Sequence, residues 1–251
     1  MSFFSSRTAR PVTAAIRPNA GTGALPRQRP RRILVANGKG GCGKTTVATN
    51  LAGYYASQNY RTALLDYDPQ GSSMHWVSVR READYPDIHA VDAHRHPGSR
   101  VTRTFQLRIP PETERVVLDA PAGVHGHQLV EMLRDVDAVL IPVLPSAIDI
   151  HAVSRFIEEL LLVGHVRARQ IRVGVIANRV RENSPVYKSL ERFLGSLRIP
   201  FITRFREADS YVIAAEQGCS IHEIRGRRNN SRDQRQWQPL IHWLEEGFRK
   251  K

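Results

Sequence analysis

Cysteine is scarce in this sequence, and long apolar segments are absent. The only two cysteines in its 251 residues are Cys42 and Cys219, which excludes a disulfide framework and suits the reducing cytosol. No stretch approaches the roughly 18 consecutive apolar residues that a membrane-spanning helix requires. Hydrophobic residues make up 41% of the chain and charged residues 24%, which is the composition of a globular protein.

Acidic residues are missing from the first quarter of the chain. No Asp or Glu precedes Asp66, whereas residues 1–65 contain ten Lys and Arg residues. The net charge of the whole chain is +13, so subtracting these ten positive charges leaves +3 for the rest. Such a basic protein favours polyanionic partners such as nucleic acid, bound through counterion release rather than through reading of the base sequence.

Residues 1–30 are rich in Arg, Ser, Pro and Gly and have no sustained hydrophobic period. We therefore predict a disordered basic tail over 1–30, followed by one folded domain over 31–251. Two other interpretations are an auxiliary DNA contact and an organellar transit peptide, which shares the Arg-rich, acid-free composition. A secretory signal is excluded because the segment lacks a continuous apolar core.

From Arg31 onward, short apolar runs alternate with amphipathic runs. They predict strands over 32–37, 62–68, 87–93, 115–121, 137–145, 170–180 and 199–205, and helices over 45–58, 72–80, 149–163, 184–197, 208–217 and 231–249. Continuous apolar character is typical of strands that are buried on both faces of a sheet. The predicted fold class is therefore α/β, with a single doubly wound, mostly parallel sheet flanked by helices.

A glycine-rich loop follows the first predicted strand. Residues 38–45 read GKGGCGKT and match G-x-x-x-x-G-K-[ST] between a predicted strand and a predicted helix. In this motif backbone amides and the helix N-terminus bind phosphate oxygens, Lys44 reaches the β- and γ-phosphates, and Thr45 ligates Mg²⁺. The sequence thus predicts a P-loop NTPase that uses ATP and Mg²⁺. The predicted ATP-binding loop consists of Gly38, Lys39, Gly40, Gly41, Cys42, Gly43, Lys44, Thr45 and Thr46.

Three aspartates lie where predicted strands end. Asp66 and Asp68 belong to LLDYDPQGSS, and Asp119 belongs to RVVLDAPAG. Ligands of open parallel sheets bind beyond the carboxyl ends of the strands, so all three carboxylates are expected beside the phosphate loop. Asp119 has the position of a Walker B aspartate that holds Mg²⁺ through water, and either Asp66 or Asp68 could orient the attacking water. The alternative is that one or more of them caps the following helix.

Lys39 places a second lysine inside the glycine loop. Together with DYDPQGS, VVLDAPAG, VLIPVLPSAID and ANRV, the loop KGGCGKTT resembles the ParA/MinD family of deviant-Walker ATPases over most of the chain. In that family the first lysine crosses the dimer interface to the partner's ATP, so the resemblance implies an ATP-dependent homodimer and assigns this role to Lys39. Two positive charges in one loop repel unless an anion neutralises both, and ATP from two subunits offers that anion. The alternative is that Lys39 points to solvent.

The same resemblance implies roles for further residues. Asp68 would orient the attacking water, Asp66 would support Mg²⁺, and Gly123 would sense the γ-phosphate. Asn178 and Arg179 would hold the adenine by hydrogen bonding and stacking. The predicted catalytic residues are thus Lys39, Lys44 and Asp68, and the predicted metal ligands are Thr45, Asp66 and Asp119, the aspartates through water.

An arginine-rich segment, residues 222–235, lies in the C-terminal region where ParA proteins place nonspecific DNA contacts. It contains five arginines and two acidic residues. Arginine suits phosphate because its planar fork donates two hydrogen bonds at once. We therefore predict sequence-independent, salt-dependent DNA binding, with a solvated basic loop as the alternative. The predicted DNA-binding residues are Arg204, Arg206, Arg225, Arg227, Arg228, Arg232 and Arg235.

The last predicted helix helps to decide whether the protein binds DNA or a membrane surface, the two alternatives in this family. Its apolar stripe consists of Trp237, Leu240, Ile241, Leu244 and Phe248, at helical spacing. The polar side includes two glutamates, which are poor partners for anionic lipid, so we expect this helix to pack on the core and membrane binding to be unlikely. A MinD-like membrane-associated regulator is the runner-up function, and a metabolic P-loop enzyme of the same superfamily is the third.

The expected function is that of a ParA-type ATPase in the cytoplasm, associated with the nucleoid. ATP would close a homodimer that binds DNA nonspecifically. A cargo-adaptor protein would stimulate hydrolysis and release the dimer. A plasmid or chromosome, a carboxysome and a chemotaxis cluster all suit this switch as cargo.

Overall fold

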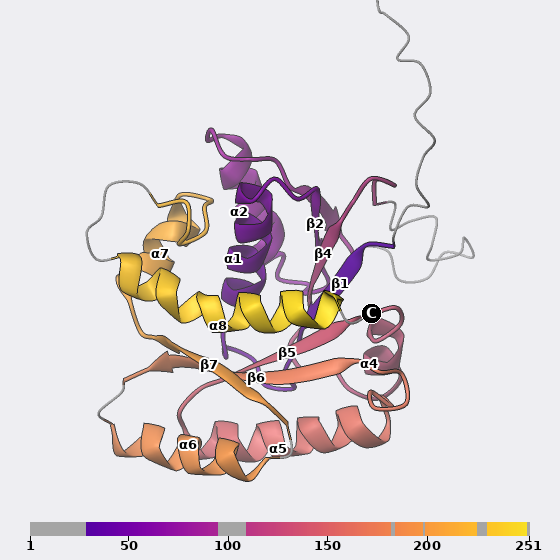
Figure 1. Ribbon diagram of the computed structural model, residues 1–251, viewed down its shortest axis with the longest axis vertical. Helices are drawn as coiled ribbons and strands as arrows, with labels where there is room; N and C mark the ends of the chain where they lie inside the picture. The colour runs from indigo at the N-terminus through magenta and orange to yellow at the C-terminus, as the bar shows by residue number, and fades with distance from the viewer. Residues whose placement is uncertain (1–28, 95–108, 182–183, 198, 225–229, 250–251) are drawn as a thin grey trace, which may run out of the picture.

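The described part of the chain forms one seven-stranded sheet in which every strand pairing is parallel (Figure 1). The computed structural model describes residues 29–94, 109–181, 184–197, 199–224 and 230–249. The strands are β1 (Arg31–Val35), β2 (Thr62–Asp66), β3 (His89–Asp92), β4 (Arg115–Asp119), β5 (Ala138–Val143), β6 (Arg172–Val180) and β7 (Phe201–Arg206), in the order β3-β2-β4-β1-β5-β6-β7. The predicted doubly wound parallel sheet is confirmed.

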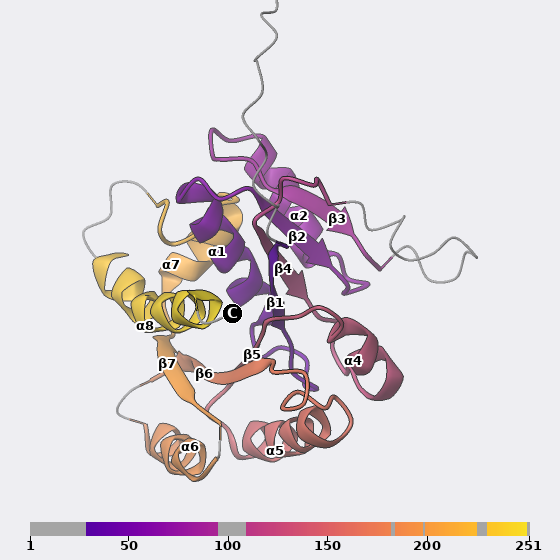
Figure 2. The ribbon, with the colours of Figure 1, turned by 45° about the vertical axis from the view of Figure 1, so that its right-hand side comes forward.

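Helices cover both faces of this sheet. They are α1 (Lys44–Ser57), α2 (Ser72–Arg81), α4 (Gly126–Met132), α5 (Ala147–Leu162), α6 (Pro185–Ser196), α7 (Asp209–Glu216) and α8 (Asn230–Arg249). Figure 2 shows α5 and α6 on one face of the sheet and α1, α7 and α8 on the other. The result is the three-layer arrangement that continuous apolar strands require.

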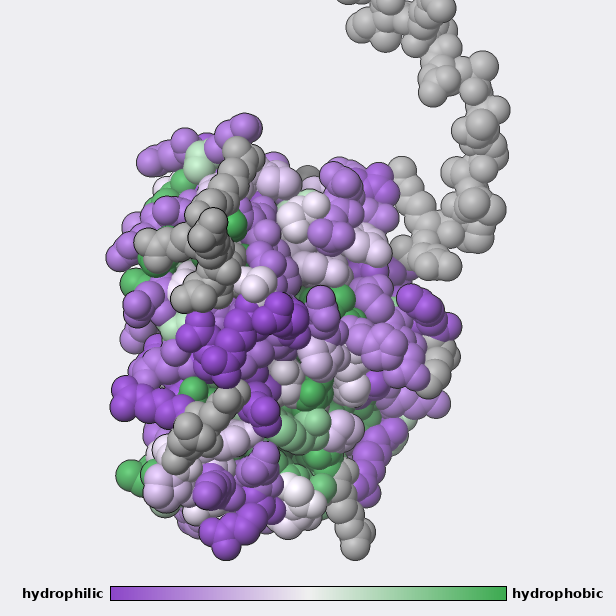
Figure 3. Space-filling view, turned by 60° about the vertical axis from the view of Figure 1, so that its left-hand side comes forward, coloured by the Kyte–Doolittle hydropathy of each residue, from purple (hydrophilic) through white to green (hydrophobic). Residues whose placement is uncertain are grey.

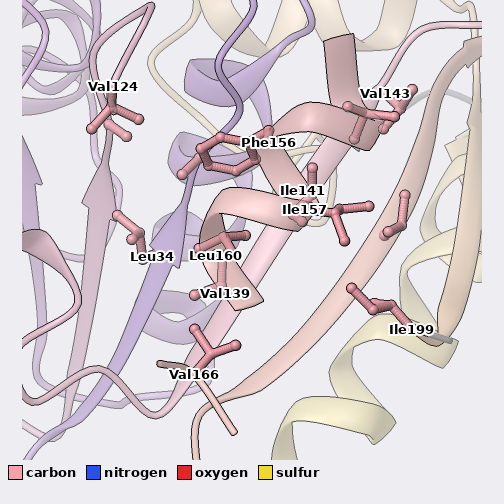
Figure 4. Close-up of a cluster of buried hydrophobic side chains, with 14 of the residues drawn as sticks. Leu34, Val124, Val139, Ile141, Val143, Phe156, Ile157, Leu160, Val166 and Ile199 are labelled. Carbon is pink, nitrogen blue, oxygen red and sulfur yellow. The ribbon is translucent and has the colours of Figure 1, made fainter. Parts of the chain in front are cut away.

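Two hydrophobic cores result, one on each face. Along β1, the Leu34 side chain belongs to the core under α5, whereas Ile33 and Val35 belong to the core under α1 and α8. All three side chains are buried, because successive residues of a strand point to opposite faces. Figure 4 shows the first of these cores, with Leu160 of α5 close to Val139 of β5.

Helix α4 was not predicted from the sequence. It has only seven residues, too few for an apolar period to stand out, and it begins at Gly126, whose φ of 54° suits glycine. Helix α5 begins two residues before its predicted start. Its N-cap is Ser146, whose hydroxyl accepts a hydrogen bond from the backbone N–H of Asp149.

The apolar stripe of α8 is packed on the core, as predicted. Trp237, Leu240, Leu244 and Phe248 are buried, and Ile241 packs against the same cluster. The Phe205 ring of β7 stacks on Trp237 with ring centroids 4.5 Å apart. Across the described ranges, no helix combines the length and the apolar character needed to cross a bilayer.

Both ends of the described chain meet at the amino edge of the sheet. The Arg29 guanidinium lies 2.6 Å from the Oδ1 atom of Asp137, a residue that is 1% exposed. Arg31 donates a hydrogen bond of 2.8 Å to the carbonyl of Phe248 near the end of α8. The predicted tail, residues 1–30, lies outside the described residues except for its last two, of which Arg29 is held by this ion pair.

A buried ion pair joins α2 to the segment that precedes α8. The Arg80 and Glu223 side chains are 2% and 6% exposed, and Arg80 Nη2 lies 2.7 Å from Glu223 Oε1. Arg80 also donates to the carbonyls of Pro86 and Gly218. A Cβ atom at Gly218 would lie 2.3 Å from the Arg80 backbone nitrogen, so glycine is required for this close approach.

Replacing Glu223 by alanine is expected to destabilise the fold by about 3–5 kcal/mol, because it leaves the Arg80 charge buried and unpaired. Urea denaturation measures this change. The matched control is Glu114→Ala, which breaks an exposed ion pair with Arg61 and is expected to cost about 1 kcal/mol or less. Equal losses for the two variants would contradict the structural role of the buried pair.

Candidate nucleotide-binding site

The glycine loop connects the carboxyl end of β1 to the first turn of α1. Gly43 is the N-cap of α1 with a φ of 91°, and a Cβ atom there would lie 2.1 Å from Asn178 Nδ2. Cys42 is buried, and burial raises the pKa of its thiol, so it acts as a small neutral residue of the loop. The first turn of α1 contains no acidic residue, which leaves its positive dipole end available to an anion.

Lys44 lies inside the curve of the loop. Lys44 is only 6% exposed. Its Nζ donates a 3.2 Å hydrogen bond to the carbonyl of Lys39. An ammonium group held against the backbone of a glycine loop is placed to contact phosphate oxygens.

Lys39 pairs with a residue that the sequence did not single out. Its Nζ lies 2.6 Å from Asp149 Oδ2, and the two side chains are 33% and 2% exposed. Asp149 sits in the first turn of α5, where the Ser146 hydroxyl also donates to Oδ2. The Lys39 charge is therefore neutralised within one subunit rather than pointing freely to solvent. The only sequence signal for this partner was its place in VLIPVLPSAID.

The sheet register brings two of the predicted carboxylates together. Asp66 of β2 lies opposite Asp119 of β4, and Asp119 lies opposite Val35, the last residue of β1 and three positions before Gly38. Asp119 is 0% exposed, and its Oδ2 accepts hydrogen bonds of 2.8 Å from the hydroxyls of Thr45 and Ser73. Burial raises the pKa of Asp119 to about 7, against the lowering effect of these two hydrogen bonds. Ser73 was missed in the sequence because a serine in a helix is usually unremarkable.

Asp66 and Asp68 both accept hydrogen bonds from the backbone that leads into α2. Asp66 accepts from the N–H groups of Asp68 and Met74, at 3.0 and 3.1 Å. Asp68 accepts from the N–H of Gln70 at 2.9 Å. Asp66 thus accepts from an N–H of the first turn of α2, whereas the partner of Asp68, Gln70, precedes that helix. The roles of both carboxylates toward Mg²⁺ and water stay predictions. Burial raises the pKa of Asp66.

The donor atoms at this edge suit Mg²⁺. The Oδ1 atom of Asp119 is buried and has no hydrogen-bond partner in the described structure, and the Thr45 hydroxyl lies on the same carboxylate. Among the described residues, no group of three or more His, Cys, Asp and Glu side chains could hold a metal by itself. This combination fits an ion that is bound by one or two carboxylates together with phosphate oxygens and water.

The remaining predicted nucleotide contacts lie on the loop that follows β4 and in the last residues of β6. Gly123 has a φ of 71°, and its carbonyl lies 2.6 Å from His125 Nδ1. Asn178 Nδ2 donates to the carbonyl of Cys42 at 2.9 Å, and its Oδ1 accepts from the N–H of Arg179. Arg179 has a φ of 49°, unusual for a non-glycine residue and frequent at functional sites. Asn178 thus ties β6 to the phosphate loop, and its contact with adenine stays a prediction.

The predicted DNA-binding arginines divide into three groups. Arg204, Arg232 and Arg235 line one groove of about 520 Å³ between β7 and the first turns of α8. Figure 3 views the side of the molecule that carries these elements and shows a band of strongly hydrophilic residues across its middle. Arg206 instead pairs with Asp233, with Nε 2.5 Å from Oδ1 and the carboxylate side chain 1% exposed. The third group, Arg225, Arg227 and Arg228, lies outside the described residues.

Known proteins match this chain over most of its length. The "Maintenance of carboxysome distribution protein A" of Halothiobacillus neapolitanus is 29% identical over 206 residues, which is 80% of this chain and 91% of that protein. A putative plasmid partition protein of Borrelia burgdorferi bound to AMPPNP has a TM-score of 0.64 at 17% identity, covering 87% of this chain and 100% of that chain. A Cyanothece McdA variant in complex with ATP has a TM-score of 0.63 at 16% identity, covering 87% and 96%.

The two solved structures establish the same fold. The family model described as "CobQ/CobB/MinD/ParA nucleotide binding domain" matches residues 33–219, which is well over half of the chain and includes every candidate nucleotide-binding residue named above. The protein therefore belongs to the CobQ/CobB/MinD/ParA family of nucleotide-binding proteins.

Proposed function

We propose that this protein is a ParA-type ATPase that dimerises on binding ATP, binds DNA without sequence preference and positions a cargo on the nucleoid. The observation that carries the proposal is the 2.6 Å ion pair between Lys39 and the buried Asp149. A second lysine in a phosphate loop needs a counter-charge, and Asp149 supplies one within the subunit. The phosphates bound by a second subunit are a competing anion, so ATP can draw Lys39 across an interface.

Hydrolysis is assigned to the groups at the carboxyl edge of the sheet. The loop amides and Lys44 would bind the β- and γ-phosphates, and Asp68 would orient the attacking water. Thr45 and Asp119 would hold Mg²⁺, with Asp66 in support; when bound, this ion neutralises charge that develops on the phosphates. Asp68 suits this role because it lies in the segment between β2 and α2 and its side chain is half-buried. Asp119, in contrast, is fully buried.

Nonspecific DNA binding is assigned to the groove lined by Arg204, Arg232 and Arg235. Three guanidinium groups along one edge of the domain follow a phosphate backbone without reading bases. A MinD-like, membrane-associated regulator would need the apolar stripe of α8 at the bilayer. That stripe is buried against the sheet, which favours DNA over membrane as the partner surface.

The cargo class is favoured by how far each relative aligns. The carboxysome distribution protein aligns over 91% of its length, whereas the chromosome-partitioning ATPase Soj of Thermus thermophilus aligns over 22% of its length. We infer a large protein assembly of the carboxysome type as cargo, reached through an adaptor that stimulates hydrolysis. The expected location is the cytoplasm, on the nucleoid.

Lys39→Ala is expected to bind ATP with nearly unchanged affinity and to lose ATP-dependent dimerisation, because the loop amides and Lys44 remain while the cross-subunit charge is gone. Light scattering after size-exclusion chromatography, in the hydrolysis-deficient Asp68→Ala background, measures the dimer. Lys188→Ala, which removes one exposed lysine from α6, is the matched control and should dimerise normally. A dimer that forms equally well with Lys39→Ala would refute the cross-subunit role.

Replacing Arg204, Arg232 and Arg235 by alanine together should weaken ATP-dependent DNA binding and flatten its salt dependence. Each lost phosphate contact lowers the slope of log affinity against log salt by about 0.9, so the triple variant should lose roughly 2–3 units of slope. Fluorescence anisotropy on a duplex of arbitrary sequence gives the slope. Arg134→Ala removes an exposed arginine at the end of α4 and should leave the slope unchanged, and a triple variant with the original slope would exclude this groove.

Arg206 is expected to behave differently from Arg204, because its carboxylate partner Asp233 is buried, whereas Glu191, which lies 4.0 Å from the Arg204 guanidinium, is exposed. Asp233→Asn decides between a structural and a direct DNA role. If Arg206 holds α8 in place, the substitution lowers both the melting temperature and DNA affinity. If Arg206 contacts phosphate directly, removing its carboxylate partner raises DNA affinity instead.

A further inference from the structure

A buried hydroxyl on α2 reaches the Walker B carboxylate. Ser73 lies in the first turn of α2, is 0% exposed, and donates a 2.8 Å hydrogen bond from Oγ to Asp119 Oδ2. Its neighbour Ser72 is exposed. Of two adjacent serines at the start of one helix, only one is directed into the site that would hold the metal.

The two oxygens of Asp119 are used unequally. Oδ2 accepts from both Thr45 and Ser73, whereas Oδ1 is buried and has no hydrogen-bond partner in the part of the chain that the structure describes. A buried carboxylate oxygen is ordinarily hydrogen-bonded. Oδ1 is therefore the oxygen of Asp119 that still has its acceptor capacity for a metal-bound water.

The two hydroxyls differ in what else they can do. Thr45 stands at the phosphate loop and is the residue expected to turn its hydroxyl toward Mg²⁺. Ser73 is anchored at its own position, because the next backbone N–H, that of Met74, donates to Asp66 Oδ2 at 3.1 Å. Asp66 and Asp119 are register partners in neighbouring strands, so the first turn of α2 is tied to both.

We propose that Ser73 is the positioning residue of the magnesium site: it keeps Asp119 Oδ2 hydrogen-bonded when Thr45 turns to the metal, and so directs Oδ1 toward the metal's water shell. This role rests on the proposed ATPase function. A donor to a metal-binding carboxylate fixes the carboxylate's orientation, and its loss typically lowers metal affinity by about 10–100-fold.

The test is a MgCl₂ titration of ATP binding by the full-length chain, followed by the fluorescence of an N-methylanthraniloyl ATP. Ser73→Ala should raise the magnesium concentration at half-saturation by about 10–100-fold. Its affinity for the nucleotide in EDTA should stay unchanged. Ser72→Ala, one residue away on the same helix, should match the unmodified protein, and Ser73→Thr should restore the response.

Each result decides the matter. A normal magnesium response in Ser73→Ala overturns the positioning role, even if the variant melts at a lower temperature, because a purely structural serine predicts that pattern. If Ser73→Ala fails to fold, Ser73→Cys keeps the volume with a weaker donor and should show a smaller shift in the same direction; no shift overturns the role. Absence of magnesium-dependent binding in the unmodified protein instead overturns the proposed function itself.

Discussion

The parallel register of the central strands is the constraint on which the site depends. It sets Asp66 opposite Asp119 and Asp119 opposite Val35, so two carboxylates and the start of the glycine loop meet at one edge. Because β1 lies between β4 and β5, the loop opens where the strand order reverses, the place where open α/β sheets bind ligands. A shift of one residue between β2 and β4 would separate the carboxylates and turn one of them into a core.

Helix α5 gathers the elements that would respond to nucleotide. Its first turn supplies Asp149 to Lys39, and its Phe156 ring lies 3.6 Å from the position of a Cβ atom on Gly38. Farther along, Glu159 accepts a hydrogen bond from the N–H of Gly126, in the segment after Gly123. One helix thus contacts both the glycine loop and the segment after Gly123. Lys39 and that segment therefore contact the same helix at two positions along its length.

The fold and the phosphate loop could be predicted because their signals are local: apolar runs, the glycine spacing and the aspartates at strand ends. The features of the site that the sequence did not reveal depend on side chains that are far apart in the sequence and come into contact only in the folded chain. Nothing near Lys39 in the sequence points to Asp149, and nothing marks Ser73 over Ser72. In the sequence nothing distinguishes Arg206 from the other arginines, and only the structure shows its ion pair with the buried Asp233. The composition gives the number of charged side chains. Which of them form ion pairs within the protein is set by the tertiary structure.

The hydrogen bond from Arg31 to the Phe248 carbonyl joins the first strand of the domain to the end of its last helix. The two ends are adjacent at the amino edge of the sheet, and the nucleotide groups lie at the carboxyl edge. Such a topology tolerates circular permutation, since a short linker can bridge the old ends without crossing the core. It also means that a fluorophore joined close to either end of the folded domain would sit at the opposite edge of the sheet from the glycine loop.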